Sequence, residues 1–269
     1  AARSGRLSSF LRRELKMSSG LMNRLKWNGG ICVNGLPQHT NYPVRPGDVI
    51  TVLLDEPEPE YPAEDGELVV DKPAGMLIHP SRATNQGTLA NLVAGYYRRS
   101  GEKSAFHPVT RLDRDTFGIV LLAKNAHLHA LLQDAAVKKT YHALTFGGPD
   151  TDTGIIDAPI ARLPLPSLLR QVSPEGKPSV TEFEVLHRNG QICKLALHPV
   201  TGRTHQLRVH CAYMGFPILG DPQYGTEESR RFSSGLGLTY QMLCAHRLEF
   251  THPLTVESMI LTSRMDVSV

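Results

Sequence analysis

Apolar residues recur at helical spacing twice near the start of the chain, in residues 7–15 and again in residues 21–25. The next segments change to a strand pattern. ICVNG (31–35) predicts a strand that enters an Asn-Gly turn, and RPGDVITVLL (45–54) predicts a turn followed by a strand. Residues 1–54 therefore predict two short helices followed by a small β element.

Residues 67–269 alternate strand and helix patterns. The expected strands are ELVVDKP (67–73), KKTYHALTFGG (138–148), TEFEVLHR (181–188) and ICKLALHPV (192–200). The expected helices are TLANLVAGYYRR (88–99), AHLHALLQDAAV (126–137) and THQLRVHCAYMG (204–215), the last with Thr204 as N-cap and Gly215 at its end. Because strands follow one another both directly and through helices, the pattern predicts an α+β or mixed-sheet fold and not a regular βαβ series.

A run of acids and prolines separates these two parts. Residues 55–67 hold seven acids and no base, with three prolines among the acids. Such a segment cannot pack into a core and is typical of an extended, semi-rigid spacer. We therefore expect a small basic domain at 1–54, an acidic proline-rich linker at 55–66 and a larger domain at 67–269.

The composition, 41% apolar and 20% charged residues with a net charge of +3, is that of an ordinary soluble globular protein. No stretch approaches the roughly 20 apolar residues that span a bilayer, and the beginning of the sequence lacks the apolar core of a secretory signal. We therefore expect a cytoplasmic protein with no membrane contact. The four cysteines are scattered, so neither disulfides nor a cysteine-based zinc site is expected.

Other metal and cofactor sites also lack support in the sequence. The pairs His127/His129 and His205/His210 have no third ligand at a recognisable spacing, so we expect no metal site. The chain has neither the glycine fingerprint of dinucleotide-binding proteins nor a phosphate-binding GxxxxGK loop. We therefore expect no cofactor.

Basic residues are concentrated in residues 1–54, which hold eight Lys or Arg against two acids. The bases that fall largely off the apolar stripes are Arg12, Arg13, Lys16, Arg24 and Lys26. They form either a solvated face or a phosphate-binding surface. The pattern RLSSFLRREL…SSGLMNRLKWNGGICVNG…VRPGDVITV resembles a small RNA-binding module first seen in a bacterial ribosomal protein. That resemblance implies a small α/β RNA-binding domain whose bases contact RNA.

Charged residues crowd the entrance of an apolar run in TRLDRDTFGIVLLA (110–123). The run 119–123 is typical of a buried strand, where unpaired charges are costly. Either the charges belong to a turn in water, or one carboxylate is held in a cleft. Strand alternation would place Asp113 and Asp115 on one side and Arg114 on the other.

Arg208 lies at the margin of the apolar face that Leu207 and Cys211 share on the expected helix 204–215. A guanidinium in such a position usually meets a carboxylate, and its planar fork suits one. The candidate partners are Asp113 and Asp115. The residue pattern leaves the choice between them open.

The segment TRLDRDTFGIVLLAKN resembles the catalytic HRLDxxTSG motif of the RluA-type pseudouridine synthases. The other motifs of this family are matched, in the family's order, by DKPAGMLIHP, KKTYHAL, HPVTGRTHQLRVHCAYMGFPILGDPQYG and QMLCAHRLEF. The resemblance spans about residues 66–260. It implies a catalytic domain with a mixed, largely antiparallel central sheet and flanking helices, and the isomerisation of uridine to pseudouridine in RNA.

The resemblance also implies a role for each matching residue. Asp113 corresponds to the catalytic aspartate, Tyr141 to the tyrosine that stacks on the target base, and Arg208 to the arginine that pairs with the aspartate. The residues implied to bind substrate are Arg111, Lys139, His205 and Leu243. The positions at which the chain departs from the family pattern are Thr110, Phe117 and Cys244.

The implied reaction oxidises nothing and imports no group, in keeping with the expected lack of a cofactor. The expected partner is structured RNA, with large-subunit ribosomal RNA favoured over transfer RNA, and no protein partner is inferred. Two alternatives belong to other classes. One is a non-catalytic RNA-binding relative, which the three departures would suit, and the other is a hydrolase that uses Asp113 and Asp115 as a carboxylate pair.

Overall fold

The fold is given by a computed structural model that describes residues 4–27, 29–54, 71–81 and 84–268. The linker expected at 55–66 lies outside the described residues, as does the first part of the strand expected at 67–73. The side chains of Arg24 and Trp27 are also outside the description.

Residues 4–54 share an apolar core in which Leu7, Leu11 and Ile31 are almost completely buried. The Asn-Gly turn between β2 and β3 is confirmed, since Asn34 and Gly35 have φ angles of 53° and 81°. β2 lies between β3 and β5 in a three-stranded antiparallel sheet, and β1 pairs with β4. The elements of this part are β1 (Gly5–Arg6), α1 (Leu7–Arg13), α2 (Ser19–Trp27), β2 (Ile31–Val33), β3 (Leu36–Pro37), β4 (Pro43–Val44) and β5 (Ile50–Val52).

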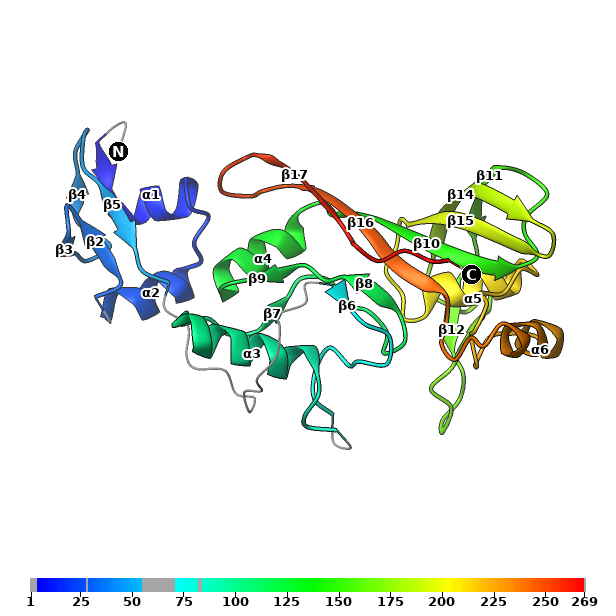
Figure 1. The fold of residues 1–269 in the computed structure, drawn as a ribbon. Helices are drawn as coiled ribbons and strands as arrows, with labels where there is room; N and C mark the ends of the chain where they lie inside the picture. The colour runs from blue at the N-terminus through cyan, green and yellow to red at the C-terminus, as the bar shows by residue number, and fades with distance from the viewer. Residues whose placement is uncertain (1–3, 28, 55–70, 82–83, 269) are drawn as a thin grey trace.

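Residues 71–268 are built on an eight-stranded sheet (Figure 1). Seven strands lie in the order β11-β14-β15-β10-β16-β8-β6, and the eighth, β17, pairs with β16. Its neighbouring strands are antiparallel except β8 and β16, which are parallel. The predicted α+β fold with a mixed, largely antiparallel sheet is therefore confirmed. The strands are β6 (Asp71–Lys72), β8 (Phe117–Ile119), β10 (Lys138–Phe146), β11 (Thr153–Asp157), β14 (Val180–Asn189), β15 (Ile192–Pro199), β16 (Leu243–Thr251) and β17 (Ser258–Thr262).

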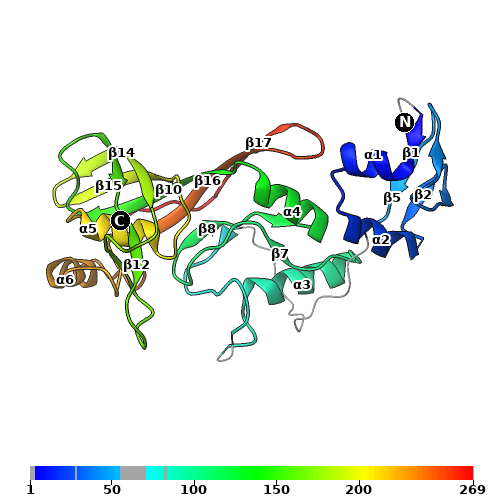
Figure 2. The same cartoon turned by 180° about the vertical axis from the view of Figure 1, so that it is seen from behind.

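Helices flank this sheet. They are α3 (Leu89–Ser100), α4 (Ala126–Asp134), α5 (Gln206–Tyr213) and α6 (Glu227–Gly235). Figure 2 shows α5 lying across one face of the sheet, where it packs on β14 and β15. No helix among the described residues is long and apolar enough to cross a membrane.

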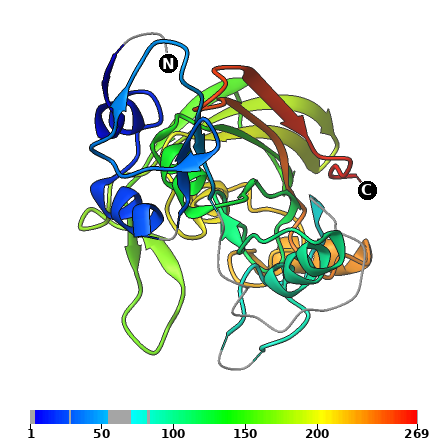
Figure 3. The ribbon, with the colours of Figure 1, turned by 90° about the vertical axis from the view of Figure 1, so that its left-hand side faces the viewer.

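Two short strand pairs lie outside the large sheet. They are β7 (His107–Pro108) with β9 (Leu122–Ala123), and β12 (Ile160–Arg162) with β13 (Arg170–Val172). The β12–β13 hairpin extends away from the sheet (Figures 1 and 3).

Successive residues of β10 pack into different cores, as the alternation of a strand requires. Ala143 packs with Leu207 in the core beneath α5. Leu144 packs with Val267 in a core on the opposite face of the sheet. The segment 263–267 therefore covers the face that α5 leaves open.

Backbone hydrogen bonds attach the segment 263–267 to two strands. The N–H of Ser263 donates to the carbonyl of His246 on β16 at 2.8 Å. The N–H of Arg264 donates to Asp71 Oδ2 on β6 at 2.9 Å. The segment thus joins one edge of the sheet to its middle.

The apolar run 119–123 is not the single strand that its pattern predicts. It is divided between β8 and β9, which belong to different sheets. Val120 packs against α3, whereas Ile119 and Leu121 pack in a core with β16. Because the run is surrounded by apolar groups, its composition indicates burial but cannot distinguish a straight strand from a bent segment.

Two helix boundaries also differ from the prediction. α4 ends at Asp134, because the chain takes an extended conformation at Ala135 on its way to β10. Thr204 is not the N-cap of α5. That position belongs to His205, which has a φ of 59° and makes no side-chain capping hydrogen bond. Gly215 follows the end of α5 with a φ of 86°, as expected.

Gly118 determines how the loop that contains Asp113 meets the sheet. It has a φ of 106° and pairs in parallel with Ala245 of β16. A Cβ atom at this position would lie 2.4 Å from the carbonyl oxygen of Ala245. Glycine is therefore required both for the backbone conformation and for the close approach of β8 to β16.

Lys72 holds the same loop from β6. Its side chain is completely buried, and its ammonium donates to three carbonyl oxygens, those of Pro73 at 2.9 Å, Met76 at 2.9 Å and Arg114 at 2.8 Å. Burial lowers the pKa of Lys72 to about 8, although the negative charges of Asp115 and Asp113 act in the other direction. One buried cation thus fixes the backbone directly after Asp113.

Replacing Gly118 by alanine should lower the free energy of unfolding by roughly 3 kcal/mol, because the new Cβ atom forces β8 away from β16. Gly235→Ala in α6 is the matched control, since a Cβ atom there meets nothing within 4 Å. Urea denaturation of both variants measures the difference. Equal midpoints for the two variants would contradict the packing described for Gly118.

Lys72→Met should also destabilise the fold, by about 2–3 kcal/mol, because it leaves three partly buried carbonyl oxygens without their donor. Lys103→Met is the control, since Lys103 is exposed and its loss should change stability by less than about 0.5 kcal/mol. Chemical denaturation followed by circular dichroism gives both values. A Lys72→Met protein as stable as the control would show that the ammonium does not hold the loop.

Candidate active site

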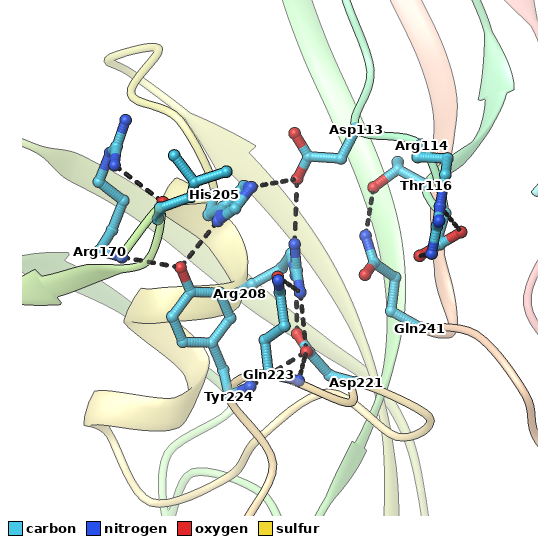
Figure 4. Close-up of polar contacts among 12 residues, drawn as sticks. Asp113, Arg114, Thr116, Arg170, His205, Arg208, Asp221, Gln223, Tyr224 and Gln241 are labelled. Carbon is cyan, nitrogen blue, oxygen red and sulfur yellow. Dashed lines mark hydrogen bonds and ion pairs between the residues drawn. The ribbon is translucent and has the colours of Figure 1, made fainter. Parts of the chain in front are cut away.

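Asp113 lies in the loop between β7 and β8, and its side chain is 31% exposed. Two nitrogen atoms face the same carboxylate oxygen, Oδ2. They are Arg208 Nη1 at 3.5 Å and His205 Nε2 at 3.9 Å (Figure 4). The structure therefore brings together three residues that the sequence analysis singled out.

Arg208 extends from α5 and is almost completely buried. Its principal partner is Asp221, which is neither of the two aspartates expected from the sequence. Arg208 Nε donates to Asp221 Oδ2 at 2.7 Å, and Nη2 donates to Asp221 Oδ1 at 2.8 Å. Burial disfavours the charged guanidinium, but the hydrogen bonds and negative charge of Asp221 outweigh it and raise the pKa of Arg208. Arg208 therefore remains a fixed positive charge beside Asp113.

The loop that follows Asp221 completes the surroundings of Arg208. The carboxylate of Asp221 accepts the backbone N–H groups of Gln223 at 2.9 Å and Tyr224 at 3.1 Å, a local turn typical of aspartate. This turn places Gln223 Oε1 2.8 Å from Arg208 Nη2. It also places the ring of Tyr224 4.8 Å from the guanidinium carbon, within cation–π distance.

Tyr224 also contacts His205. The hydroxyl oxygen of Tyr224 lies 2.7 Å from His205 Nδ1, and it accepts the backbone N–H of Arg170 at 3.0 Å. Burial lowers the pKa of His205, and the positive charges of Arg208 and Arg170 lower it further, against the opposite effect of Asp113. His205 is therefore neutral at pH 7 and contacts Asp113 and Tyr224 with different ring nitrogens.

Tyr141 lies in β10, where it pairs with Leu197 and Ala245 on either side. Its ring packs against the apolar core beneath α5 and against the core that contains Leu248. Burial raises the pKa of its hydroxyl, and the nearby negative charge of Asp113 adds to this effect. The ring of Tyr141 is therefore a neutral aromatic surface close to Asp113.

The other expected substrate-binding residues have different surroundings. Leu243 begins β16 and is buried in the core beneath α5, against which Tyr141 packs. Lys139 is partly buried in β10, and burial lowers its pKa. Arg111 is exposed in the loop before Asp113. No ion pair joins Lys139 or Arg111 to Asp113 among the contacts of the described residues.

Asp115 does not lie beside Asp113 as strand alternation predicts. Residues 114 and 115 form a turn, and Arg114 pairs with Asp115 through Nε–Oδ1 at 2.9 Å and Nη2–Oδ2 at 3.0 Å. Arg114 is 63% exposed, so this pair lies at the surface. The prediction that Arg114 points away from Asp115 is therefore wrong, because a turn replaces the expected strand.

The three departures from the family motif have structural partners in this chain. The hydroxyl of Thr110 accepts the backbone N–H of Leu121 at 2.9 Å. Phe117 and Cys244 are buried in one apolar core, and Cys244 Sγ donates to the carbonyl of Met265 at 3.4 Å. Beside them, Gln241 donates to the hydroxyl of Thr116 at 2.7 Å (Figure 4). Each of the three side chains is therefore accommodated by its own surroundings in the fold.

The histidine pairs considered as metal ligands are hydrogen-bonded to the protein itself. His127 Nε2 lies 2.7 Å from the carbonyl of Leu15, and His129 Nε2 lies 3.2 Å from that of Pro108. His210 contacts the hydroxyl of Thr181 and the carbonyl of Ala158, both at 2.9 Å. These contacts explain the histidines as structural groups.

A different trio has the composition of a metal site. His142, His246 and Asp266 bring ligand atoms within 4.8 Å of one another. However, His142 Nδ1 lies 2.8 Å from Asp266 Oδ1, and Lys194 Nζ lies 2.6 Å from Asp266 Oδ2. Both carboxylate oxygens are therefore already engaged, and an ammonium stands beside the position that a metal ion would occupy.

The site offers a half-exposed carboxylate, a guanidinium fixed beside it, a neutral imidazole and an aromatic ring. Two of the buried cysteines are poor nucleophiles, because burial raises the pKa of Cys211 and of Cys244 to about 12. The Asp113 carboxylate is partly exposed beside Arg208, and a carboxylate in such a place can act as a nucleophile or a base.

Sequence reasoning missed several residues around Asp113. Asp221, Gln223 and Tyr224 follow the apolar segment 216–219, and this change from apolar to polar residues was a usable signal. Lys72 lies near the end of the expected strand 67–73, and a charged residue in that position was a signal of the same kind. Its burial was not visible in the sequence, because it depends on carbonyl groups brought together only by folding.

The basic residues of α1 and its surroundings are placed at the surface. Arg12, Arg13 and Lys16 are exposed, and Arg12 donates to the hydroxyl of Ser19 at 3.0 Å. Lys26 is partly buried, and the side chain of Arg24 is outside the described residues. At least three of the five bases are therefore accessible to a ligand.

Comparisons with known proteins agree on the family. The family model described as RNA pseudouridylate synthase matches residues 67–213. A Bacillus subtilis protein called uncharacterized RNA pseudouridine synthase YjbO is 37% identical over 263 residues, covering 91% of this chain and 90% of that protein. The ribosomal large subunit pseudouridine synthase C of Vibrio cholerae is 32% identical over 274 residues, covering 92% of this chain and 85% of that protein.

Solved structures show the same fold. Human RNA pseudouridylate synthase domain containing 1 aligns with a TM-score of 0.58 and 24% identity, over 75% of this chain and 86% of that one. Human RNA pseudouridylate synthase domain containing 4 aligns with the same TM-score and identity, over 74% of this chain and 84% of that one. Together with the matched family model, these findings show that the chain belongs to the RNA pseudouridylate synthase family and is an isomerase that acts on RNA.

Proposed function

We propose that the enzyme converts uridines of large-subunit ribosomal RNA to pseudouridine, with Asp113 as the essential carboxylate. The observation that carries this proposal is the half-exposed Asp113 side chain, whose Oδ2 faces a guanidinium that Asp221 already holds in place. The name of the Vibrio cholerae relative, a ribosomal large subunit pseudouridine synthase, supports the choice of RNA. Such a substrate implies that the enzyme works in the cytoplasm.

The reaction is balanced without any additional reactant. The bond between N1 of uracil and C1′ of ribose breaks, a bond between C5 and C1′ forms, C5 loses its proton, and N1 gains one. A single carboxylate can supply the nucleophile or the base that such a rearrangement requires. Arg208 supports this role, because a nearby positive charge favours the ionised form of a carboxylate.

The target uridine must leave its stack before it can reach Asp113, which costs a few kcal/mol. We propose that Tyr141 recovers part of this cost by stacking on the uracil, since stacking on an aromatic side chain contributes roughly 1–3 kcal/mol per base. The partial exposure of Tyr141 and its proximity to Asp113 support this assignment. Leu243, packed beneath Tyr141, would keep the ring in place.

Residues 1–54 are proposed to act as a separate RNA-binding domain, joined by residues 55–66 to the catalytic domain at 67–269. The apolar core confined to residues of the first part supports this division. The exposed bases Arg12, Arg13 and Lys16 would contact phosphates of structured RNA outside the target nucleotide.

Asp113→Asn should abolish turnover, with a loss of at least about a thousand-fold in kcat, because the amide can neither attack nor accept a proton. The matched control is Asp115→Asn, which removes a carboxylate engaged with Arg114 at the surface and should retain most activity. Release of tritium from RNA labelled at uracil C5 measures both. Full turnover by a folded Asp113→Asn protein would refute the assignment.

Replacing Arg12, Arg13 and Lys16 together by glutamine should weaken RNA binding. It should also make the fall of log K with log salt concentration shallower, by about two to three in slope. Turnover at saturating RNA should not change, because these residues lie outside the catalytic site. The control replaces Arg98, Arg99 and Lys103, which are exposed on or just after α3. An equal change of slope in both triple variants would indicate a general charge effect and contradict the proposed role of residues 1–54.

A further inference from the structure

We propose that His205 and Tyr224 are a positioning pair that, together with Arg208, holds Oδ2 of Asp113, so that Oδ1 is the oxygen that reacts. The inference rests on the proposed function of Asp113. It assigns His205 a contact with the carboxylate, whereas the family resemblance implies a contact with the substrate.

The two oxygens of Asp113 have different surroundings. Both Arg208 Nη1 and His205 Nε2 face Oδ2, at 3.5 and 3.9 Å. In Figure 4 the other carboxylate oxygen points away from these two nitrogens. Among the described residues, no hydrogen bond or ion pair reaches Oδ1. Both nitrogens therefore face one oxygen, and the second is left available.

The hydrogen bonds of Tyr224 favour one position of the proton on His205. The hydroxyl oxygen already accepts the backbone N–H of Arg170, so its own proton is free to be donated to His205 Nδ1, 2.7 Å away. A neutral imidazole that accepts at Nδ1 carries its proton on Nε2. That N–H faces Asp113 Oδ2.

Tyr224 also contacts Arg208. Its ring lies 4.8 Å from the guanidinium carbon and meets the ring of His205 edge to face at a centroid distance of 5.6 Å. One side chain therefore positions both groups that face Oδ2. The hydroxyl acts on His205, and the ring acts on Arg208.

The backbone of His205 supports a functional role for its side chain. A φ of 59° is unfavourable for a residue other than glycine, and such conformations cluster at functional sites. The side chain does not compensate by capping α5. Instead, the ring of His205 contacts Tyr224 through Nδ1 at 2.7 Å and faces Asp113 through Nε2 at 3.9 Å.

This arrangement has a consequence for the pH dependence of turnover. Protonation of His205 places a positive charge beside Asp113 Oδ2 and makes the carboxylate a weaker nucleophile and base. The charged groups that act on His205 are Asp113, Arg208, Arg170 and Asp221, with Tyr224 as its hydrogen-bond partner. Since burial lowers the pKa of His205 below its ordinary value near 6.5, kcat should fall on the acid side of that value.

The test uses the full chain and transcribed large-subunit ribosomal RNA labelled with tritium at uracil C5. Tyr224→Phe, which keeps the ring on Arg208, should lower kcat about tenfold with KM changed less than twofold. His205→Gln should lower kcat by at least as much and lose the acid limb attributed to His205. The double variant should be no slower than His205→Gln alone, because the hydroxyl acts through the imidazole. His187→Gln, at an exposed position of β14, is the control and should match the unchanged enzyme.

Three results would overturn the inference: a higher KM with unchanged kcat in His205→Gln, an unaltered acid limb in that variant, or independent losses that multiply in the double variant. Tyr224→Phe decides the question alone if His205→Gln fails to fold, because full kcat in Tyr224→Phe excludes a role for the hydroxyl.

The proposed function has a separate readout. Turnover by Asp113→Asn contradicts the essential carboxylate, whereas an inactive Asp113→Asn with a fully active Tyr224→Phe rejects only the positioning pair.

Discussion

The buried ion pair between Arg208 and Asp221 is the interaction on which the site depends. A guanidinium removed from water must be paired and hydrogen-bonded, and Asp221, Gln223 and the ring of Tyr224 meet this requirement. The pair joins α5 to the loop that begins at Asp221. Since Arg208 still has Nη1 directed at Asp113, the same pair places a permanent positive charge 3.5 Å from the Asp113 carboxylate.

A second buried cation acts on the other side of the Asp113 loop. Lys72 binds the carbonyl of Arg114, while Gly118 allows the chain to enter the sheet immediately afterwards. The loop is therefore restrained at its backbone by β6 and β8 and at its side chain by α5. Groups held in this way on regular elements are suited to reactions that require a constant geometry.

The sequence was informative where a pattern depends on neighbours in the chain. Helices α1 to α5, the strands β10, β14 and β15, and the Asn-Gly turn follow from spacing and turn chemistry, whereas α6 was not predicted. The margin position of Arg208 correctly indicated a carboxylate partner. It did not indicate Asp221, because several carboxylates were available and folding selects among them. The bend after β8 and the left-handed conformation of His205 were also hidden, since both are imposed by contacts with distant segments.

The attachment of residues 263–267 to Asp71 and His246 has a consequence for the order in which the molecule is assembled. Strand β6, which carries Lys72, is joined to a segment far along the chain, since Asp71 and Arg264 are 193 residues apart. Contacts of such sequence separation form late, after most of the chain has been synthesised. Until the segment 263–267 has been made, β6 lacks the hydrogen bond between Asp71 and Arg264 that attaches it to the end of the chain.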